Sequence, residues 1–359
     1  MEKFQYRHGG ECRGKQIRLD FSVNTNPLGL PFFVRKKLEQ PEVIHAFSCY
    51  PDSDSSRLCA LIAQKEGVKE KQVICGNGAS ELLYGLAGAF RGKRGLLVSP
   101  CFVEYEAALL AGGVEVLWYD RKREAGFTVG EDFFRTLLQE KPELLILCNP
   151  GNPMGELLAP DFLERALWTV LSYGGSLVVD ECFLTLTGRE KELSMAGRAG
   201  MQKGLFVLKA FTKTYAMAGL RLGYLVGNDS ALSDIRKKLP DWNVSLPAQI
   251  AGECVLTEQE AEKLYIEETL SLLHEERRFL KKGLSELSLH AADGQANYLF
   301  FQADPELYGK MLQQGILIRQ CGNYRRLCRS DYRIAVRSHA ENRQLVEALK
   351  KCQSGQRQM

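Results

Sequence analysis

The sequence predicts an α/β protein with a mostly parallel seven-stranded sheet, covered by helices on both faces, and a smaller α+β domain. Short apolar runs predict the strands, at 72–75, 95–99, 114–119, 144–148, 176–179, 205–209 and 223–226. Amphipathic stretches predict intervening helices, at 80–90, 103–111, 160–172 and 229–238. Such alternation is typical of a parallel sheet buried on both sides. Because ligands of these sheets bind at the carboxyl ends of strands, we look for a site there.

The pattern changes after Pro240. An amphipathic stretch at 258–287 predicts a long helix, short strands are predicted near 297–301, 316–319 and 332–336, and a final helix begins near residue 341. This is typical of a smaller α+β domain. The first residues of the chain precede the first sheet unit, so we predict that they join this domain. The large domain is therefore predicted at 40–240, and the small domain at 1–39 and 241–359.

Composition argues against several classes of function. The net charge is +3, and basic residues alternate with acidic ones, which does not favour a nucleic-acid partner. The 11 cysteines show no metal-ligand or redox spacing, so we expect free thiols in a reducing compartment and no metal site. The first ten residues lack the apolar core of a signal peptide, and no apolar run is long enough for a bilayer. We expect a soluble, cytoplasmic protein without membrane partners.

The most informative segment spans residues 209–224. Lys213 follows a predicted strand, and a turn of small residues continues through Gly219, Arg221 and Gly223. An amine in a pocket can form an imine with an aldehyde cofactor, and nearby cations lower its pKa. An arginine can hold a phosphate through two parallel hydrogen bonds. A surface lysine and a helix-capping arginine would explain the two residues singly, but the spacing of the whole segment favours a cofactor site.

This segment resembles the lysine signature of the class I/II aminotransferase-like enzymes of fold type I, which use pyridoxal 5'-phosphate (PLP). The resemblance runs from His8 to about Leu345, with the remaining motifs in family order. It implies that Lys213 and Asp180 are the catalytic residues. Lys213 would carry PLP as an imine, and Asp180, at the end of Leu-Val-Val-Asp, would keep the pyridine nitrogen protonated so that the ring accepts electrons.

The resemblance also implies further contacts to PLP. Asn152, in Asn-Pro-Gly-Asn-Pro, would donate to the phenolic oxygen, and Phe102 would stack on the ring. The phosphate would be held by the amides of a glycine-rich helix start, an arginine and a hydroxyl: Gly78, Ala79, Ser80, Arg221 and Thr212. Taken singly, Asn152 fits a simple turn and Phe102 fits the core. Tyr50 would reach the cofactor phosphate of another subunit, which implies a homodimer with shared active sites.

Two positions depart from the family pattern. Ala210 stands where many members have a Ser or Thr that touches the phosphate, and Thr212 is the candidate to compensate. Phe183 stands where many aminotransferases have a Tyr that donates to the phenolic oxygen, which leaves that role to Asn152. Both departures bear on cofactor affinity and not on the identity of the cofactor.

Within the family the chain resembles the threonine-phosphate decarboxylases of cobalamin biosynthesis. That resemblance rests on His8-Gly9-Gly10, on the segment 20–29 and on the segment 318–324. It implies a pocket for a phosphorylated amino acid, lined by His8, Gly9, Ser22, Asn24, Asn152, Arg319 and Arg333. Arg333 would bind the substrate carboxylate, and Arg319 the substrate phosphate. Without the resemblance, a frayed terminus at His8 and a capping turn at Ser22 and Asn24 would be the simpler interpretations.

Three alternatives stay open at this point. A histidinol-phosphate-type aminotransferase would use the same cofactor residues and also bind a phosphorylated substrate. A serine-phosphate decarboxylase would differ only in the pocket for the threonine methyl group. A catalytically idle PLP-binding homologue is disfavoured, because the cofactor residues are intact.

Overall fold

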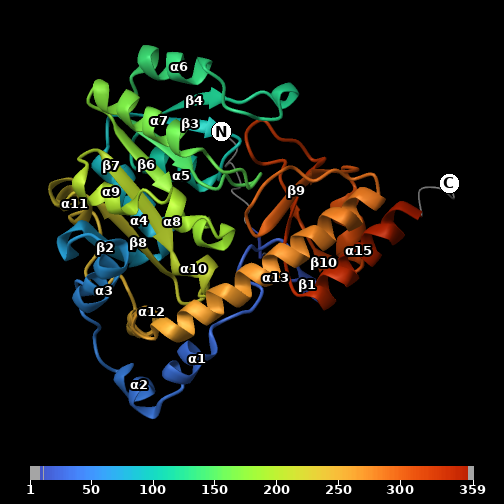
Figure 1. The fold of residues 1–359 in the computed structure, drawn as a ribbon, viewed down its shortest axis with the longest axis horizontal. Coiled ribbons are helices and arrows are strands. Elements are labelled where there is room, and N and C mark those ends of the chain that lie inside the picture. The colour runs from blue at the N-terminus through green and yellow to red at the C-terminus, as the bar shows by residue number, and fades with distance from the viewer. Residues whose placement is uncertain (1–8, 11, 355–359) are drawn as a thin grey trace.

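The computed structural model describes residues 9–10 and 12–354, and its largest feature is a seven-stranded sheet (Figure 1). The strand order is β2-β8-β7-β6-β5-β3-β4, and β8 is antiparallel to both of its neighbours while the other pairs are parallel. The strands are β2 (Val73–Asn77), β3 (Arg94–Ser99), β4 (Glu115–Asp120), β5 (Leu144–Cys148), β6 (Ser176–Asp180), β7 (Leu205–Ala210) and β8 (Leu222–Gly227). The predicted seven-stranded, mostly parallel sheet is confirmed, each strand within two residues of its predicted bounds.

Helices cover both faces of this sheet, which is why its central strands read as continuous apolar runs. Alternate residues of β5, β6 and β7 enter two separate hydrophobic cores. One core contains α4 (Gly78–Ala89), α5 (Glu104–Ala111) and α11 (Asp229–Arg236). The other contains α3 (Ser56–Glu66), α6 (Asp132–Glu140), α7 (Pro160–Ser172), α9 (Ala196–Met201) and α12 (Leu246–Thr257). The shorter helices of this region are α1 (Phe32–Leu38), α2 (Pro41–Ala46), α8 (Glu190–Leu193) and α10 (Phe211–Thr214).

The C-terminal part of the chain builds a second, smaller body. An antiparallel sheet of order β11-β12-β9 joins β9 (Tyr298–Gln302), β11 (Arg319–Gln320) and β12 (Asp331–Ala335). It is accompanied by α14 (Leu307–Gln313), α15 (His339–Ser354) and the long α13 (Gln259–Glu286), which runs across Figure 1 from the large sheet to this body. Near the N-terminus, β1 (Leu19–Asp20) pairs in parallel with β10 (Ile316–Leu317). The exact boundaries of the two domains stay a prediction.

The N-terminal segment also contacts the lysine turn of the large sheet. Asn26 N donates to Lys213 O at 3.0 Å, and Asn26 Nδ2 donates to Thr214 O at 2.8 Å. The carboxyl ends of the central strands therefore face both this segment and the small sheet, and the candidate site lies between them.

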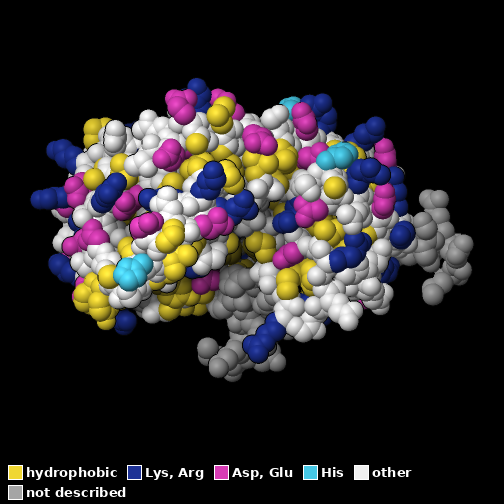
Figure 2. All heavy atoms as spheres, turned by 90° about the horizontal axis from the view of Figure 1, so that it is seen from below, with side chains coloured by type: hydrophobic (Ala, Val, Ile, Leu, Met, Phe, Trp, Pro, Cys, Tyr) yellow, Lys and Arg dark blue, Asp and Glu magenta, His cyan; other side chains and the backbone are white. Residues whose placement is uncertain are grey.

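The surface carries charges of both signs. On the face seen in Figure 2, dark blue and magenta side chains are interspersed over the described part of the molecule. Among the described residues, no helix combines the length and the apolar character that a membrane span requires.

Candidate active site

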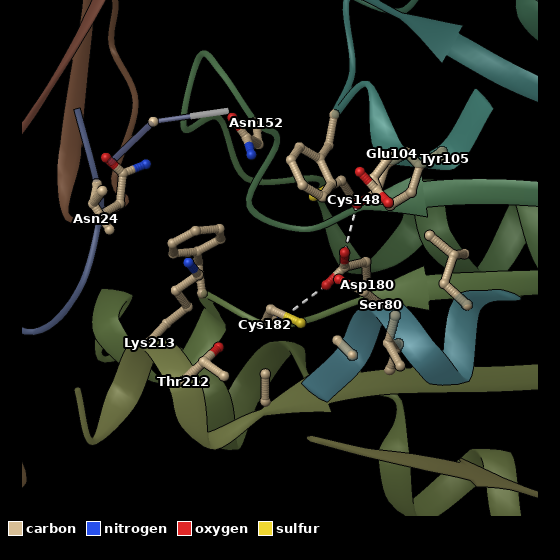
Figure 3. Close-up of a pocket in the computed structure, with 18 of the residues that line it drawn as sticks. Asn24, Ser80, Glu104, Tyr105, Cys148, Asn152, Asp180, Cys182, Thr212 and Lys213 are labelled. Atoms are coloured by element: carbon tan, nitrogen blue, oxygen red, sulfur yellow. Dashed lines mark hydrogen bonds between the residues drawn. The ribbon is translucent and has the colours of Figure 1, made fainter. Parts of the chain in front are cut away.

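A cavity of about 370 Å³ lies where the carboxyl ends of β5, β6 and β7 meet the N-terminal segment and the small sheet. Figure 3 shows its side chains converging from these separate elements. The cavity is lined by most of the residues predicted for the site: Gly9, Ser22, Asn24, Ala79, Ser80, Phe102, Asn152, Asp180, Thr212, Lys213, Arg221, Arg319 and Arg333. Residues that lie up to about 320 positions apart in the sequence thus share one pocket.

Lys213 projects from the short helix α10 into this cavity (Figure 3). Its Nζ lies 5.7 Å from the centre of the Phe183 ring. Burial, together with the positive charges of Arg333 and Arg221, lowers the pKa of Lys213 to about 8. At neutral pH most of the amine is still protonated, but more of it is neutral, and able to react with an aldehyde, than for an ordinary lysine.

A second buried lysine lies four residues earlier and has the opposite surroundings. Lys209 Nζ is 2.9 Å from Glu66 Oε1, 2.6 Å from Glu190 Oε1 and 3.9 Å from Glu181 Oε2. Burial lowers the pKa of Lys209, but these carboxylates outweigh that effect and raise it above its usual value. Lys209 is thus held as a cation away from the cavity, while the pocket favours the free amine of Lys213.

Asp180 ends β6 and presents its carboxylate to the cavity. Oδ1 accepts a hydrogen bond from the backbone N–H of Cys182 at 2.9 Å, and Oδ2 accepts one from the Tyr105 hydroxyl at 2.6 Å (Figure 3). Burial and the adjacent Asp180 charge raise the pKa of Tyr105 well above its ordinary value, so the phenol stays a donor. The carboxylate is therefore held in one orientation from two sides.

The start of α4, which directly follows β2, lies against the side chain of Arg221. Gly78 has a φ of +76°, and a Cβ built on it would lie 2.5 Å from Arg221 Nη2. On the opposite side, a Cβ on Gly223 would lie 2.5 Å from the backbone nitrogen of Ala79. The two glycines let the guanidinium and β8 approach the first turn of α4, whose free backbone N–H groups favour an anion.

Asn152 is oriented by its neighbours. Its Oδ1 accepts hydrogen bonds from Arg333 Nη1 at 2.6 Å and from the Tyr324 hydroxyl at 3.4 Å. Since the oxygen is engaged by two donors, the Nδ2 group remains as the donor that this amide offers elsewhere. This matches the donor role that the resemblance implies for Asn152, in a pocket where Phe183 offers no hydroxyl.

Arg333 and Arg319 lie directly opposite each other on the antiparallel strands β12 and β11. They are 6% and 7% exposed. Arg333 Nη2 donates to Ser22 O at 3.0 Å, and Asn24, with its side-chain oxygen turned toward Arg333, accepts from Nε at 3.1 Å. Arg319 Nη2 donates to Asn323 Oδ1 at 2.8 Å. Directly opposed residues of a sheet project on the same face, so both guanidinium groups line the cavity.

Comparison with known proteins identifies the family. Residues 16–349 match the family model for aminotransferase class I and II. The chain belongs to this family. It is 32% identical to a threonine-phosphate decarboxylase from Salmonella typhimurium, over 99% of each chain. It is 30% identical to a histidinol-phosphate aminotransferase from Carboxydothermus hydrogenoformans, over 93% of this chain and 92% of the relative.

A solved structure agrees with this assignment. The histidinol-phosphate aminotransferase from Clostridium acetobutylicum superposes with a TM-score of 0.85 at 27% identity, covering 94% of this chain and 99% of that one. The fold is that of the fold type I aminotransferases, and the protein is an enzyme of this PLP-dependent family. The predicted family, fold and cofactor are confirmed.

The residues present fit PLP. The cavity combines an amine of lowered pKa, a carboxylate fixed by two donors, and a glycine turn whose missing Cβ leaves space beside Arg221. We propose that Lys213 binds the aldehyde carbon, Asp180 the pyridine nitrogen, Asn152 the phenolic oxygen, and the Gly78–Ser80 turn with Thr212 and Arg221 the phosphate.

Three predicted residues are not among those that line the cavity. Gly78 contributes through the turn described above. Tyr50 is 82% exposed, its ring centre is 5.0 Å from that of Trp242, and it does not line the active-site cavity of its own chain. His8 lies outside the described residues, and its predicted role stays a prediction.

Sequence reasoning missed several residues of the pocket. They are Glu104, Tyr105, Cys148, Cys182 and Tyr324. Tyr105 lies only three residues after Phe102, at the start of the predicted helix 103–111, and this nearness in sequence was the available signal. Cys148 and Cys182 end or follow strands next to predicted site residues, but cysteines in apolar runs indicate a core position equally well.

Proposed function

We propose that this protein decarboxylates L-threonine O-3-phosphate to (R)-1-amino-2-propanol O-2-phosphate, a step of cobalamin biosynthesis, in the cytoplasm. The observation that carries the proposal is the pair Arg319–Arg333. Two buried guanidinium groups on one face of the small sheet repel each other unless anions lie between or beside them. A substrate with both a carboxylate and a phosphate supplies an anion for each arginine.

Each residue of the site then has a defined task. Arg333 binds the substrate carboxylate, and Arg319 the substrate phosphate, with Ser22, Asn24 and Gly9 as neighbours in the pocket. Gly9 permits close approach of two backbones, since a Cβ on it would lie 2.3 Å from Ser22 O. PLP, when bound, supplies the ring that accepts the electron pair left on Cα as CO₂ departs. Asp180 holds a proton at the pyridine nitrogen, and Lys213 Nζ delivers a proton to Cα.

The same residues could serve an aminotransferase, so the choice between the two reactions rests on the way the substrate is held. If a second anchor at the phosphate turns the carboxylate bond into the reactive orientation, CO₂ leaves in place of the Cα proton. The histidinol-phosphate aminotransferases are the rival, because they share the fold and a phosphorylated substrate. The decarboxylase is favoured by Phe183 and by the similarity to the Salmonella typhimurium relative, which extends over nearly all of both chains.

We further propose that the protein is a homodimer with shared active sites. The support is Tyr50, which is exposed and beside the exposed ring of Trp242 while lying outside its own chain's cavity. A second copy would bury both rings and bring Tyr50 to the other subunit's cofactor phosphate.

One assay separates the proposals. Purified protein loaded with PLP is mixed with threonine phosphate, and CO₂ release is measured with and without 2-oxoglutarate. We expect release that needs no keto acid. Absence of CO₂ together with amino transfer from histidinol phosphate to 2-oxoglutarate would identify an aminotransferase instead. Serine phosphate, tested in parallel, determines whether the methyl group of threonine is required.

A further inference from the structure

Two cysteines outside the active site, one on a helix and one on a strand, face each other. Cys59 lies on α3 and Cys75 on β2, and their Sγ atoms are 3.6 Å apart. Each residue is 5% exposed. A disulfide has a bond length of about 2.05 Å, so the two sulfurs need to approach by roughly 1.5 Å to form one. Small side-chain rotations can supply part of such a movement.

A cavity of about 250 Å³ gives a small molecule access to this pair. Its lining includes both cysteines, Arg236 and Asn243, and none of its lining residues lines the active-site cavity. The rest of the wall comes from the segment before α3 and the start of α3, the turn before β2, β2 itself and the segment after α11. Hydrogen peroxide, which is scarcely larger than water, is of a size to enter it.

The two thiols are electrostatically different. The hydrogen bond with Cys75 lowers the pKa of Cys59, and the nearby Arg236 charge acts in the same direction. The same hydrogen bond and burial raise the pKa of Cys75. Because the thiolate is the nucleophile in sulfur chemistry, Cys59 is the residue suited to react first, and Cys75 is placed to react second.

We propose that Cys59 and Cys75 are a redox modification site, which a peroxide oxidises to an intramolecular disulfide. The Cys59 thiolate attacks one peroxide oxygen, the O–O bond breaks, and the leaving hydroxide takes up a proton to form water. The sulfur of Cys75 then attacks the resulting Cys59 sulfenic acid: the S–S bond forms, the S–O bond breaks, and the hydroxide leaves as water with the Cys75 proton. Two thiols lose two electrons in total, and the peroxide gains them. A dithiol reductant returns the disulfide to two thiols and is itself oxidised to a disulfide.

The location gives this site a connection to the cofactor pocket. Cys75 lies three residues before Gly78, whose backbone meets Arg221. β2 is one of the two edge strands of the large sheet. A covalent bond from this edge strand to α3 would therefore form beside the turn that we assign to the cofactor phosphate.

Peptide mapping of the intact protein tests the proposal without any use of catalytic activity. Trypsin releases Cys59 in residues 58–65 and Cys75 in residues 72–91, and each peptide contains a single cysteine. After treatment with hydrogen peroxide and alkylation of the remaining thiols, we expect these peptides to be recovered as one linked species. Its mass should be two hydrogens below the sum of the two, and dithiothreitol should separate it.

Two variants provide the controls. Cys59→Ser should abolish the linked species. Cys254→Ser, which alters a buried cysteine whose thiol faces Phe33 O at 3.8 Å, should leave it intact. The proposal is overturned if wild-type protein yields both peptides fully alkylated at peroxide doses that oxidise the exposed Cys49 and Cys328. It is equally overturned if Cys59 or Cys75 is recovered linked to other cysteines instead. The wild-type measurement does not depend on the folding of any variant.

Discussion

The hydroxyl of Tyr105 donates a hydrogen bond to Asp180 Oδ2 at 2.6 Å, in a buried position beside the cofactor pocket. Tyr105 is a positioning residue, because it acts through the carboxylate. Tyr105→Phe removes a donor from a charged acceptor, a loss of about 1.5–3 kcal/mol. The carboxylate is then held by one donor in place of two. We expect kcat to fall about tenfold and the absorption band of the bound cofactor to shift.

Tyr119→Phe is the matched control, since this tyrosine donates to Asp132 at 2.9 Å and lies outside the active-site cavity. It should leave kcat and the absorption band of the cofactor unchanged. Equal changes in both variants would show that Tyr105 has only a structural role.

Lys213 makes the stability of the apoprotein depend on pH. The pKa of Lys213 is lowered from 10.5 to about 8, so between these values the unfolded chain retains a proton that the folded protein has released. Stability from this group therefore rises as the pH increases from about 8 to 10.5, by on the order of 2 kcal/mol after allowance for partial exposure to the cavity. Lys213→Met should flatten the slope in denaturant unfolding, whereas the exposed Lys203→Met should not.

The same amine should account for the covalent attachment of PLP. Borohydride reduction of the loaded protein should fix the cofactor to the peptide that contains Lys213, and Lys213→Ala should yield no such adduct. An adduct that persists in this variant, for example at Lys209, would contradict the assignment.

Gly78→Ala should weaken PLP binding by at least about tenfold. The new Cβ would lie 2.5 Å from Arg221 Nη2 and displace the guanidinium, and the φ of +76° adds strain. Pyridoxal, which lacks the phosphate, should lose much less affinity in the same absorbance titration. Gly174→Ala is the control, because Gly174 has a φ of +82° and a Cβ added there would have no heavy atom within 4 Å beyond its chain neighbours. Equal losses for both variants would point to general backbone strain.

Arg319→Gln should raise the KM for threonine phosphate by about 10- to 100-fold, which corresponds to a lost charged hydrogen bond of about 1.5–3 kcal/mol. The kinetics with unphosphorylated L-threonine should change less. The control is Arg325→Gln in the segment between β11 and β12, an arginine paired with Asp120 at 2.7 Å and half exposed. If Arg319→Gln raises the KM for threonine phosphate and for threonine by the same factor, the substrate phosphate is bound elsewhere.

Lys209→Met should destabilise the protein by about 3–5 kcal/mol, because it leaves buried carboxylates without their cation. Chemical denaturation measures the loss. The exposed pair Lys237–Asp234, at 3.0 Å, provides the comparison: Lys237→Met should change stability by no more than about 1 kcal/mol. If Lys209→Met lowers the free energy of unfolding only slightly, the neighbouring carboxylates become protonated without a large loss of stability.

Much of the fold and of the cofactor site could be predicted from the sequence. The buried strands are continuous apolar runs in the sequence, and Asp180 and the segment before Lys213 stand at the ends of two of them. The hydrophobic pattern and the family motif therefore predicted the same place for the site. The pairing of Arg319 with Arg333 could not be predicted, because strand register depends on contacts between segments that are distant in the chain. The carboxylates that raise the pKa of Lys209 could not be predicted, since Glu66 lies on a helix 143 residues away in the sequence.

The hydrogen bond from Arg333 to Asn152 joins the small sheet to the loop after β5. If Arg333 binds the substrate carboxylate and Asn152 contacts the phenolic oxygen of the cofactor, then substrate binding and cofactor binding are linked through the side-chain amide of Asn152. Replacing Arg333 would alter the colour of the resting holoenzyme before any substrate is added, since the chromophore would lose an oriented neighbour. Occupancy of the substrate pocket would accordingly be visible as an optical signal at the cofactor.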